Sequence, residues 1–121
     1  MTTIDDQPVL AITHEIVGET RVVQCVGEID LATVPGLRDR VAALQVEGPA
    51  RLVIDLTGVT FIDSLGLGAL IGFHKRARVL QGSMVIVCTS ERVMGVLRAT
   101  SLDRVFRIVD GLEDAFAEEL V

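Results

Sequence analysis

Short apolar runs alternate with segments whose apolar residues recur every three or four positions, and this alternation constrains the fold more than any other feature. We expect strands at residues 9–17, 21–26, 51–56, 83–88 and 104–109. The first two strands are expected to form an antiparallel hairpin. Each later strand follows a helical segment, which favours parallel pairing through right-handed crossovers. The sequence thus predicts an α/β fold of order ββαβαβαβα, with a mostly parallel five-stranded sheet, an N-terminal antiparallel hairpin and about four helices.

The helical segments have recognisable boundaries. In the first, the residues that recur at helical spacing are Leu31, Val34, Leu37, Val41 and Leu44. The first helix is expected to begin near Thr33 and to end before Gly48-Pro49, and the second to cover residues 64–79. The third is expected to begin after Ser90, and the fourth to run from residue 110 or 111 through Leu120.

The length and charge of the chain limit the number of domains and the kinds of partner that we expect. With 121 residues we expect one domain over residues 9–121, preceded by a flexible N-terminus at 1–8. The net charge of −6 argues against nucleic acid and anionic membrane surfaces as partners. Residues 1–7 are polar and acidic, unlike a signal peptide, and the longest apolar stretch, 65–73, is too short to span a bilayer. We therefore expect a cytoplasmic protein.

The two cysteines, Cys25 and Cys88, both lie in apolar runs and form no C-x-x-C motif. Two cysteines and two scattered histidines do not make a metal framework, and no cofactor is expected. We expect two reduced, buried thiols. A redox role stays open, and it requires the two Cα atoms to come within about 7 Å of each other.

The segment that follows the third expected strand, residues 55–68, is the richest candidate site. Loops at the carboxyl ends of parallel strands are where sites form. Ser64 stands at a helix start, where the helix dipole favours a phosphate, although Asp63 opposes it by charge repulsion. Read alone, the Asp-Ser pair indicates a helix cap. Gly68 and Gly72 share a helix face and suggest close packing against the sheet or a partner, and Gly66 is expected to leave Ser64 accessible.

Catalysis by Ser64 is not expected. A hydrolase nucleophile needs a base and an oxyanion hole. The G-x-S-x-G motif is absent, because Ile62 stands two positions before Ser64. His14 lies in a strand, and His74 lies ten residues along the helix, about 15 Å away. There is no Walker A lysine either. The sequence therefore predicts a protein that is not an enzyme.

Three stretches, residues 27–33, 52–68 and 100–106, resemble the single-domain bacterial STAS proteins that act as anti-sigma factor antagonists, also called anti-anti-sigma factors. The resemblance covers nearly the whole chain and implies the STAS fold. It also implies that Ser64 is the phosphoryl acceptor, with Asp30 and Asp63 as acidic neighbours. Many members have a second Ser or Thr after the acceptor, whereas Leu65 stands there in this chain.

The resemblance implies a partner-switching cycle in transcription regulation. The unphosphorylated protein would bind an anti-sigma factor that is also a GHKL-type serine kinase, and so release a sigma factor. Phosphorylation of Ser64 would end binding, and a PP2C-type phosphatase would restore it. The implied partner-binding residues are Asp30, Thr33, Asp63, Ser64, Leu65, Gly66 and Leu67. The alternative is a STAS signalling module regulated by another input, such as thiol redox or a small ligand.

Overall fold

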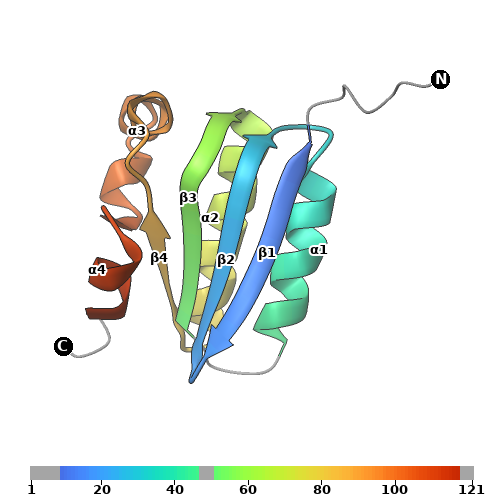
Figure 1. The fold of residues 1–121 in the computed structure, drawn as a ribbon, viewed down its shortest axis with the longest axis vertical. Coiled ribbons are helices and arrows are strands. Elements are labelled where there is room, and N and C mark those ends of the chain that lie inside the picture. The colour runs from blue at the N-terminus through green and yellow to red at the C-terminus, as the bar shows by residue number, and fades with distance from the viewer. Residues whose placement is uncertain (1–8, 47–50, 118–121) are drawn as a thin grey trace.

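The computed structural model describes residues 9–46 and 51–117, which form one five-stranded sheet with helices packed against it (Figure 1). The strands are β1 (Leu10–Val17), β2 (Thr20–Ile29), β3 (Arg51–Ile62), β4 (Ser83–Val87) and β5 (Arg107–Val109). The helices are α1 (Val34–Gln45), α2 (Ser64–Val79), α3 (Glu91–Ala99) and α4 (Leu112–Ala117), with a 3-10 turn, η2, at Leu102–Arg104. The predicted α/β fold and its element order are confirmed.

The strands follow one another across the sheet in the order β1-β2-β3-β4-β5. The pair β1–β2 is antiparallel and turns at Gly18, whose φ of +63° is a conformation that glycine adopts without strain. The pairs β2–β3, β3–β4 and β4–β5 are parallel. The carboxyl ends of β2 and β3 therefore reach the same edge of the sheet, and α1 and α2 both begin there (Figure 1).

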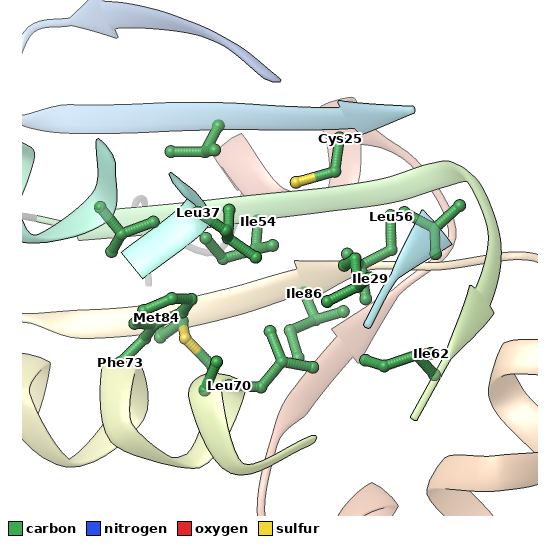
Figure 2. Packing of buried hydrophobic residues seen from close by; sticks show 14 of the residues in the cluster. Cys25, Ile29, Leu37, Ile54, Leu56, Ile62, Leu70, Phe73, Met84 and Ile86 are labelled. Carbon is green, nitrogen blue, oxygen red and sulfur yellow. The ribbon is translucent and has the colours of Figure 1, made fainter. Parts of the chain in front are cut away.

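The two faces of the sheet are covered by different helices. Alternate strand residues point to opposite faces, so Val23 and Ile54 belong to one core cluster and Val22 and Val53 to another. The first cluster joins the sheet to α1, α2 and α3. Figure 2 shows part of it, with Leu37 of α1 and Leu70 and Phe73 of α2 among the strand residues. The second is smaller and packs under α4 around Ala115. In Figure 1, α1 and α2 run side by side behind the sheet.

The central strands are longer than the sequence predicts. β3 was expected to end at residue 56, but it continues to Ile62 and pairs there with the end of β2. Gly58 interrupts the apolar run and suggests a loop, yet two register shifts, between Gln24 and Val26 and between Gly27 and Glu28, let both strands bend and remain paired. As a result, Asp63 alone separates β3 from α2.

Other predicted boundaries also shift. The expected strand at 104–109 begins only at Arg107, because Leu102–Arg104 form the 3-10 turn and Phe106 N–H bonds the Leu102 carbonyl at 2.9 Å. Leu31 lies outside α1, which begins at Val34. The N-terminal segment at 1–8, the expected stop at Gly48-Pro49, and Leu120 lie outside the described residues.

Candidate functional site

Asp63 joins the two loops that meet at the carboxyl edge of the sheet. Its backbone N–H donates to the Ile29 carbonyl at 3.1 Å. Its Oδ1 accepts from Gly66 N–H at 2.9 Å, so Asp63 is the N-cap of α2. Its Oδ2 accepts from Leu31 N–H at 3.2 Å. One carboxylate thus caps the helix and holds the loop between β2 and α1 against the helix start.

Asp30 and Thr33 shape that loop from within. Asp30 Oδ1 accepts from the N–H groups of Ala32 at 3.0 Å and Thr33 at 3.2 Å. Thr33 Oγ1 donates a hydrogen bond to the Glu28 carbonyl at 2.8 Å and accepts one from Asp30 N–H at 2.9 Å. The two side chains therefore bind backbone groups of their own loop, an arrangement typical of turns that position a neighbouring surface.

Ser64 is the first residue of α2 and is exposed. Within residues 9–46 and 51–117, no group forms a hydrogen bond with its hydroxyl. The cap of α2 is Asp63, so the serine hydroxyl is not consumed in capping as the Asp-Ser pattern alone suggests. The hydroxyl is thus presented to solvent at the positive end of a 16-residue helix.

Gly66 and Leu67 lie beneath this surface and not on it, contrary to the expectation that both contact a partner. A Cβ on Gly66 would lie 2.7 Å from Ile29 Cγ2 and 2.7 Å from Ile62 Cγ1. Gly66 is therefore needed for the close approach of α2 to β2 and β3, and not for access to Ser64. Leu67 is 8% exposed and belongs to the main core cluster, so it anchors the first turn of α2.

Exposed apolar side chains flank Ser64 in the sequence and at the neighbouring loop. Leu65 is 42% exposed, Phe61 at the end of β3 is 41% exposed, and Leu31 is 72% exposed. Leu31 and Leu65 line the same hollow of about 430 Å³. The sequence assigned Leu31 to the buried stripe of the first helix. The Asp30 turn delays the helix start to Val34 and leaves Leu31 in solvent.

Neither histidine is placed as a base for Ser64. Arg40 Nη1 lies 3.2 Å from His14 Nδ1, so His14 is engaged at the β1 edge. His74 packs edge-on against Phe106, with ring centroids 5.7 Å apart, and lies about 15 Å along α2 from Ser64. Burial, and then the charge of Arg78, lower the pKa of His74. In the described residues, no cluster of three or more His, Cys, Asp and Glu side chains forms a possible metal site.

The two cysteines are buried and free. Burial raises the pKa of Cys25 to about 12, with a further contribution from the Asp55 carboxylate. Burial also raises the pKa of Cys88. Cys25 lies in β2 and Cys88 directly follows β4, with β3 between them, so their Cα atoms are about two strand spacings, roughly 10 Å, apart. This separation excludes an intramolecular disulfide.

No helix in the described part of the chain has the length and apolar character needed to cross a bilayer.

Comparison with known proteins identifies the family. The STAS domain matches residues 11–115. The anti-sigma-B factor antagonist of Listeria monocytogenes is 35% identical over 68% of this chain and 72% of its own length. The crystal structure of an anti-sigma factor antagonist from Mycobacterium paratuberculosis has a TM-score of 0.84 and 28% identity, covering 98% of this chain and 97% of that one.

A third similar protein, SpoIIAA of Bacillus, has solved structures in two states and shares the fold. Its unphosphorylated form matches with a TM-score of 0.78 at 20% identity, over 92% of this chain and 98% of that one. Its phosphorylated form matches with a TM-score of 0.70 at 21% identity, over 88% and 98%. With the motif, the fold and these relatives in agreement, the chain belongs to the STAS domain family, among relatives that are anti-sigma factor antagonists.

Proposed function

We propose that this chain is an anti-sigma factor antagonist and that phosphorylation of Ser64 switches it off. The observation that carries the proposal is the unengaged Ser64 hydroxyl, exposed at the first turn of α2 beside the exposed Leu31 and Leu65. The names of the relatives support the activity, and the structure of SpoIIAA in a phosphorylated form supports a phosphorylation switch in this fold. This is a binding role, and the chain performs no catalysis.

The unphosphorylated chain binds an anti-sigma factor and thereby releases a sigma factor. The contact surface consists of Ser64 and Leu65 of α2 together with Asp30 and Thr33 of the loop before α1, to which we add Leu31. Asp63 holds these two parts together through its bonds to Leu31 and Gly66. Burial of Leu31 and Leu65 supplies apolar contact, because both are exposed in the free chain. Gly66 and Leu67 support the surface from the core.

The anti-sigma factor is also the kinase, of the GHKL type. It transfers the γ-phosphoryl group of Mg-ATP to Ser64 Oγ, with loss of the hydroxyl proton and release of ADP. A PP2C-type phosphatase then hydrolyses the phosphoserine to serine and inorganic phosphate. Because these partners act on transcription in bacteria, we place the cycle in the cytoplasm.

The physical effect of phosphate differs between the free chain and the complex. In the free chain, the helix dipole offsets a negative group by about 0.3–1 kcal/mol, so the fold tolerates the modification despite the neighbouring Asp63. In the interface, a group of about −1.5 to −2 charges must lose its water beside Asp63. A loss of roughly 3 kcal/mol in the complex weakens binding by about a hundredfold. The phosphate therefore acts on binding and not on folding.

The test compares Ser64→Ala with Ser64→Glu and Ser64→Asp. We expect the alanine variant to bind the purified anti-sigma factor constitutively, in the presence of ATP, and the acidic variants to bind at least about a hundredfold more weakly. Thr89→Glu is the matched control, because Thr89 is also an exposed hydroxyl residue at the carboxyl edge of the sheet. Mass spectrometry after incubation with the kinase should place one phosphate on Ser64. Equal affinities of all Ser64 variants, or a phosphate elsewhere, would contradict the proposal.

A further inference from the structure

A groove runs down the seam between α1 and α2, starting beside Ser64. Its upper hollow, about 430 Å³, lies between Leu31, Arg38 and Asp39 on one side and Leu65 on the other. Its lower hollow, about 250 Å³, lies between Arg38 and the stretch from Gly68 to Arg76. Arg38 borders both hollows, which therefore adjoin each other, and we call the two together the α1–α2 groove. From Leu65 to Arg76 it extends about 16 Å along α2.

Two glycines open the lower part of this groove without an internal reason. A Cβ on Gly68 or on Gly72 would meet no atom within 4 Å, and both residues are exposed. The sequence suggests that these glycines allow close packing against the sheet or a partner, and the structure shows that they do not pack against the sheet. Each costs the helix about 1 kcal/mol relative to alanine. Gly66 differs, because β2 and β3 require it. Gly68 and Gly72 therefore leave room for another molecule to approach the backbone of α2 closely.

Two exposed arginines stand at the lower part of the groove. Arg38 of α1 and Arg76 of α2 both line the lower hollow and are exposed. Neither makes a side-chain hydrogen bond or an ion pair with any residue in 9–46 or 51–117. The chain as a whole carries a net charge of −6. Among the described residues, the lining of the lower hollow has these two cations and no carboxylate, which favours a partner that brings a carboxylate to this place.

We propose that the α1–α2 groove seats an α-helix of the anti-sigma factor, with an Asp or Glu side chain between Arg38 and Arg76 and small side chains against Gly68 and Gly72. A helix fits because a groove between two helices accepts the ridge of a third, and glycine lets the backbones come close. The groove is continuous with the Ser64 surface through Leu65. This inference rests on the proposed function and names how the same partner is held.

The arginines then have a defined task. The Arg38–Arg76 pair attracts the carboxylate of the docked helix and so fixes where that helix lies and in which direction it docks. Phosphorylation of Ser64 adds negative charge at the upper end of the same groove. The phosphate therefore faces the docked acidic helix as well as Asp63, which increases its effect on the complex.

The test measures the affinity of the purified anti-sigma factor for groove variants by titration calorimetry. Arg38→Glu and Arg76→Glu should each weaken binding by about tenfold or more. Arg92→Glu is the matched control, an exposed arginine on α3 without an ion pair in the described residues, and should bind as the wild type does. Gly72→Leu should also weaken binding by about tenfold while its Tm is unchanged or raised, because the site has open space and leucine is a good helix former. Gly95→Leu, at an open site on α3, controls for the glycine change.

The outcomes separate this inference from the proposed function. If Ser64→Glu fails to bind while the groove variants bind as the wild type does, the groove is not a docking site and the proposed function stands. If Ser64→Ala and Ser64→Glu bind equally, the proposed function is wrong. If the groove variants change only self-association of the chain in sedimentation, the occupant is a second copy, which overturns the inference. The stable Gly72→Leu variant decides the question even if an arginine variant folds poorly.

Discussion

The Asp63 carboxylate accepts a hydrogen bond from the backbone N–H of Leu31 at 3.2 Å, although 32 residues separate the two in sequence. The other oxygen of the same carboxylate caps α2 through Gly66 N–H at 2.9 Å. The exposed Leu31 and the exposed Ser64 are therefore held at a constant position relative to each other. This relationship makes one surface from two loops, and it is the first feature that mutation should test.

Replacement of Asp63 by alanine should destabilise the fold and weaken partner binding. The variant loses the helix cap and the bond to Leu31, which together are worth roughly 1–3 kcal/mol of unfolding free energy. Urea unfolding measures the stability, and calorimetry with the anti-sigma factor measures the affinity. Ser90→Ala is the control: it removes the cap of α3, where Ser90 Oγ accepts from Val93 N–H at 3.3 Å, away from the Ser64 surface. It should cost about 1 kcal/mol and leave binding unchanged. An Asp63→Ala protein with wild-type affinity would show that the bond to Leu31 does not shape the interface.

Replacement of Gly66 by alanine should destabilise the chain even though alanine is the better helix former. The new Cβ would lie 2.7 Å from Ile29 Cγ2 and from Ile62 Cγ1, and 3.2 Å from the Ile29 carbonyl oxygen. Such overpacking typically costs about 1–3 kcal/mol, which outweighs the gain in helix propensity of about 1 kcal/mol.

Gly68→Ala provides the comparison, because its Cβ would meet no atom within 4 Å. It should stabilise the chain by up to about 1 kcal/mol. Equilibrium unfolding in urea measures both changes. Two variants of equal stability would mean that the first turn of α2 moves freely away from β2 and β3.

Lowering the pH should destabilise the fold in part through His74. Burial, and then Arg78, lower the pKa of His74 below its ordinary value of 6.5 in the folded chain. Between the folded and unfolded pKa values the unfolded chain binds more protons, so the unfolding free energy falls as the pH falls below about 6.5. Stability is retained above that value.

His74→Gln should therefore show a smaller loss of stability between pH 7.5 and 5 than the wild type, in urea unfolding at several pH values. His14→Gln keeps His74 in place and serves as the control. If the unfolding free energy of His74→Gln depends on pH as that of the wild type does, His74 is not the source of the pH dependence. Because His74 packs against Phe106, the variant should also have a lower stability at neutral pH.

The cysteines should not react in the native chain. Cys25 is 1% exposed and its pKa is raised to about 12, and Cys88 is 2% exposed. A neutral, buried thiol is a poor nucleophile, so we expect no labelling by iodoacetamide at pH 7 under native conditions and labelling of both thiols in urea. Mass spectrometry counts the labels, and the same experiment after mild oxidation should show no intramolecular disulfide. Labelling of Cys25 faster than global unfolding would reveal a local opening of β2.

The local sequence pattern was sufficient to predict the fold class and to place the Asp63-Ser64 motif at the start of a helix. The change between strand and helix periodicity is a property of neighbouring residues, so the element order and the start of α2 at Ser64 were confirmed. The boundaries of β3 and β5 were wrong, because strand length depends on pairing partners that are distant in sequence. Gly58 and the Asp63-Ser64 helix start made residues 57–62 look like a loop, whereas their pairing with β2 makes them strand.

The sequence by itself determined the α/β architecture and the acidic character of the chain. It also determined the presence of Asp63 and Ser64 at a helix start, since each depends on composition or on neighbours in the chain. The tertiary structure alone decided which side chains share the surface. It placed Leu31 in solvent, Leu67 in the core, and Gly66 against Ile29, because these outcomes depend on how α2 packs on β2 and β3. The hydrogen bond between Asp63 and Leu31 was also decided by the tertiary structure, because the two residues come together only when the parallel strands β2 and β3 have paired.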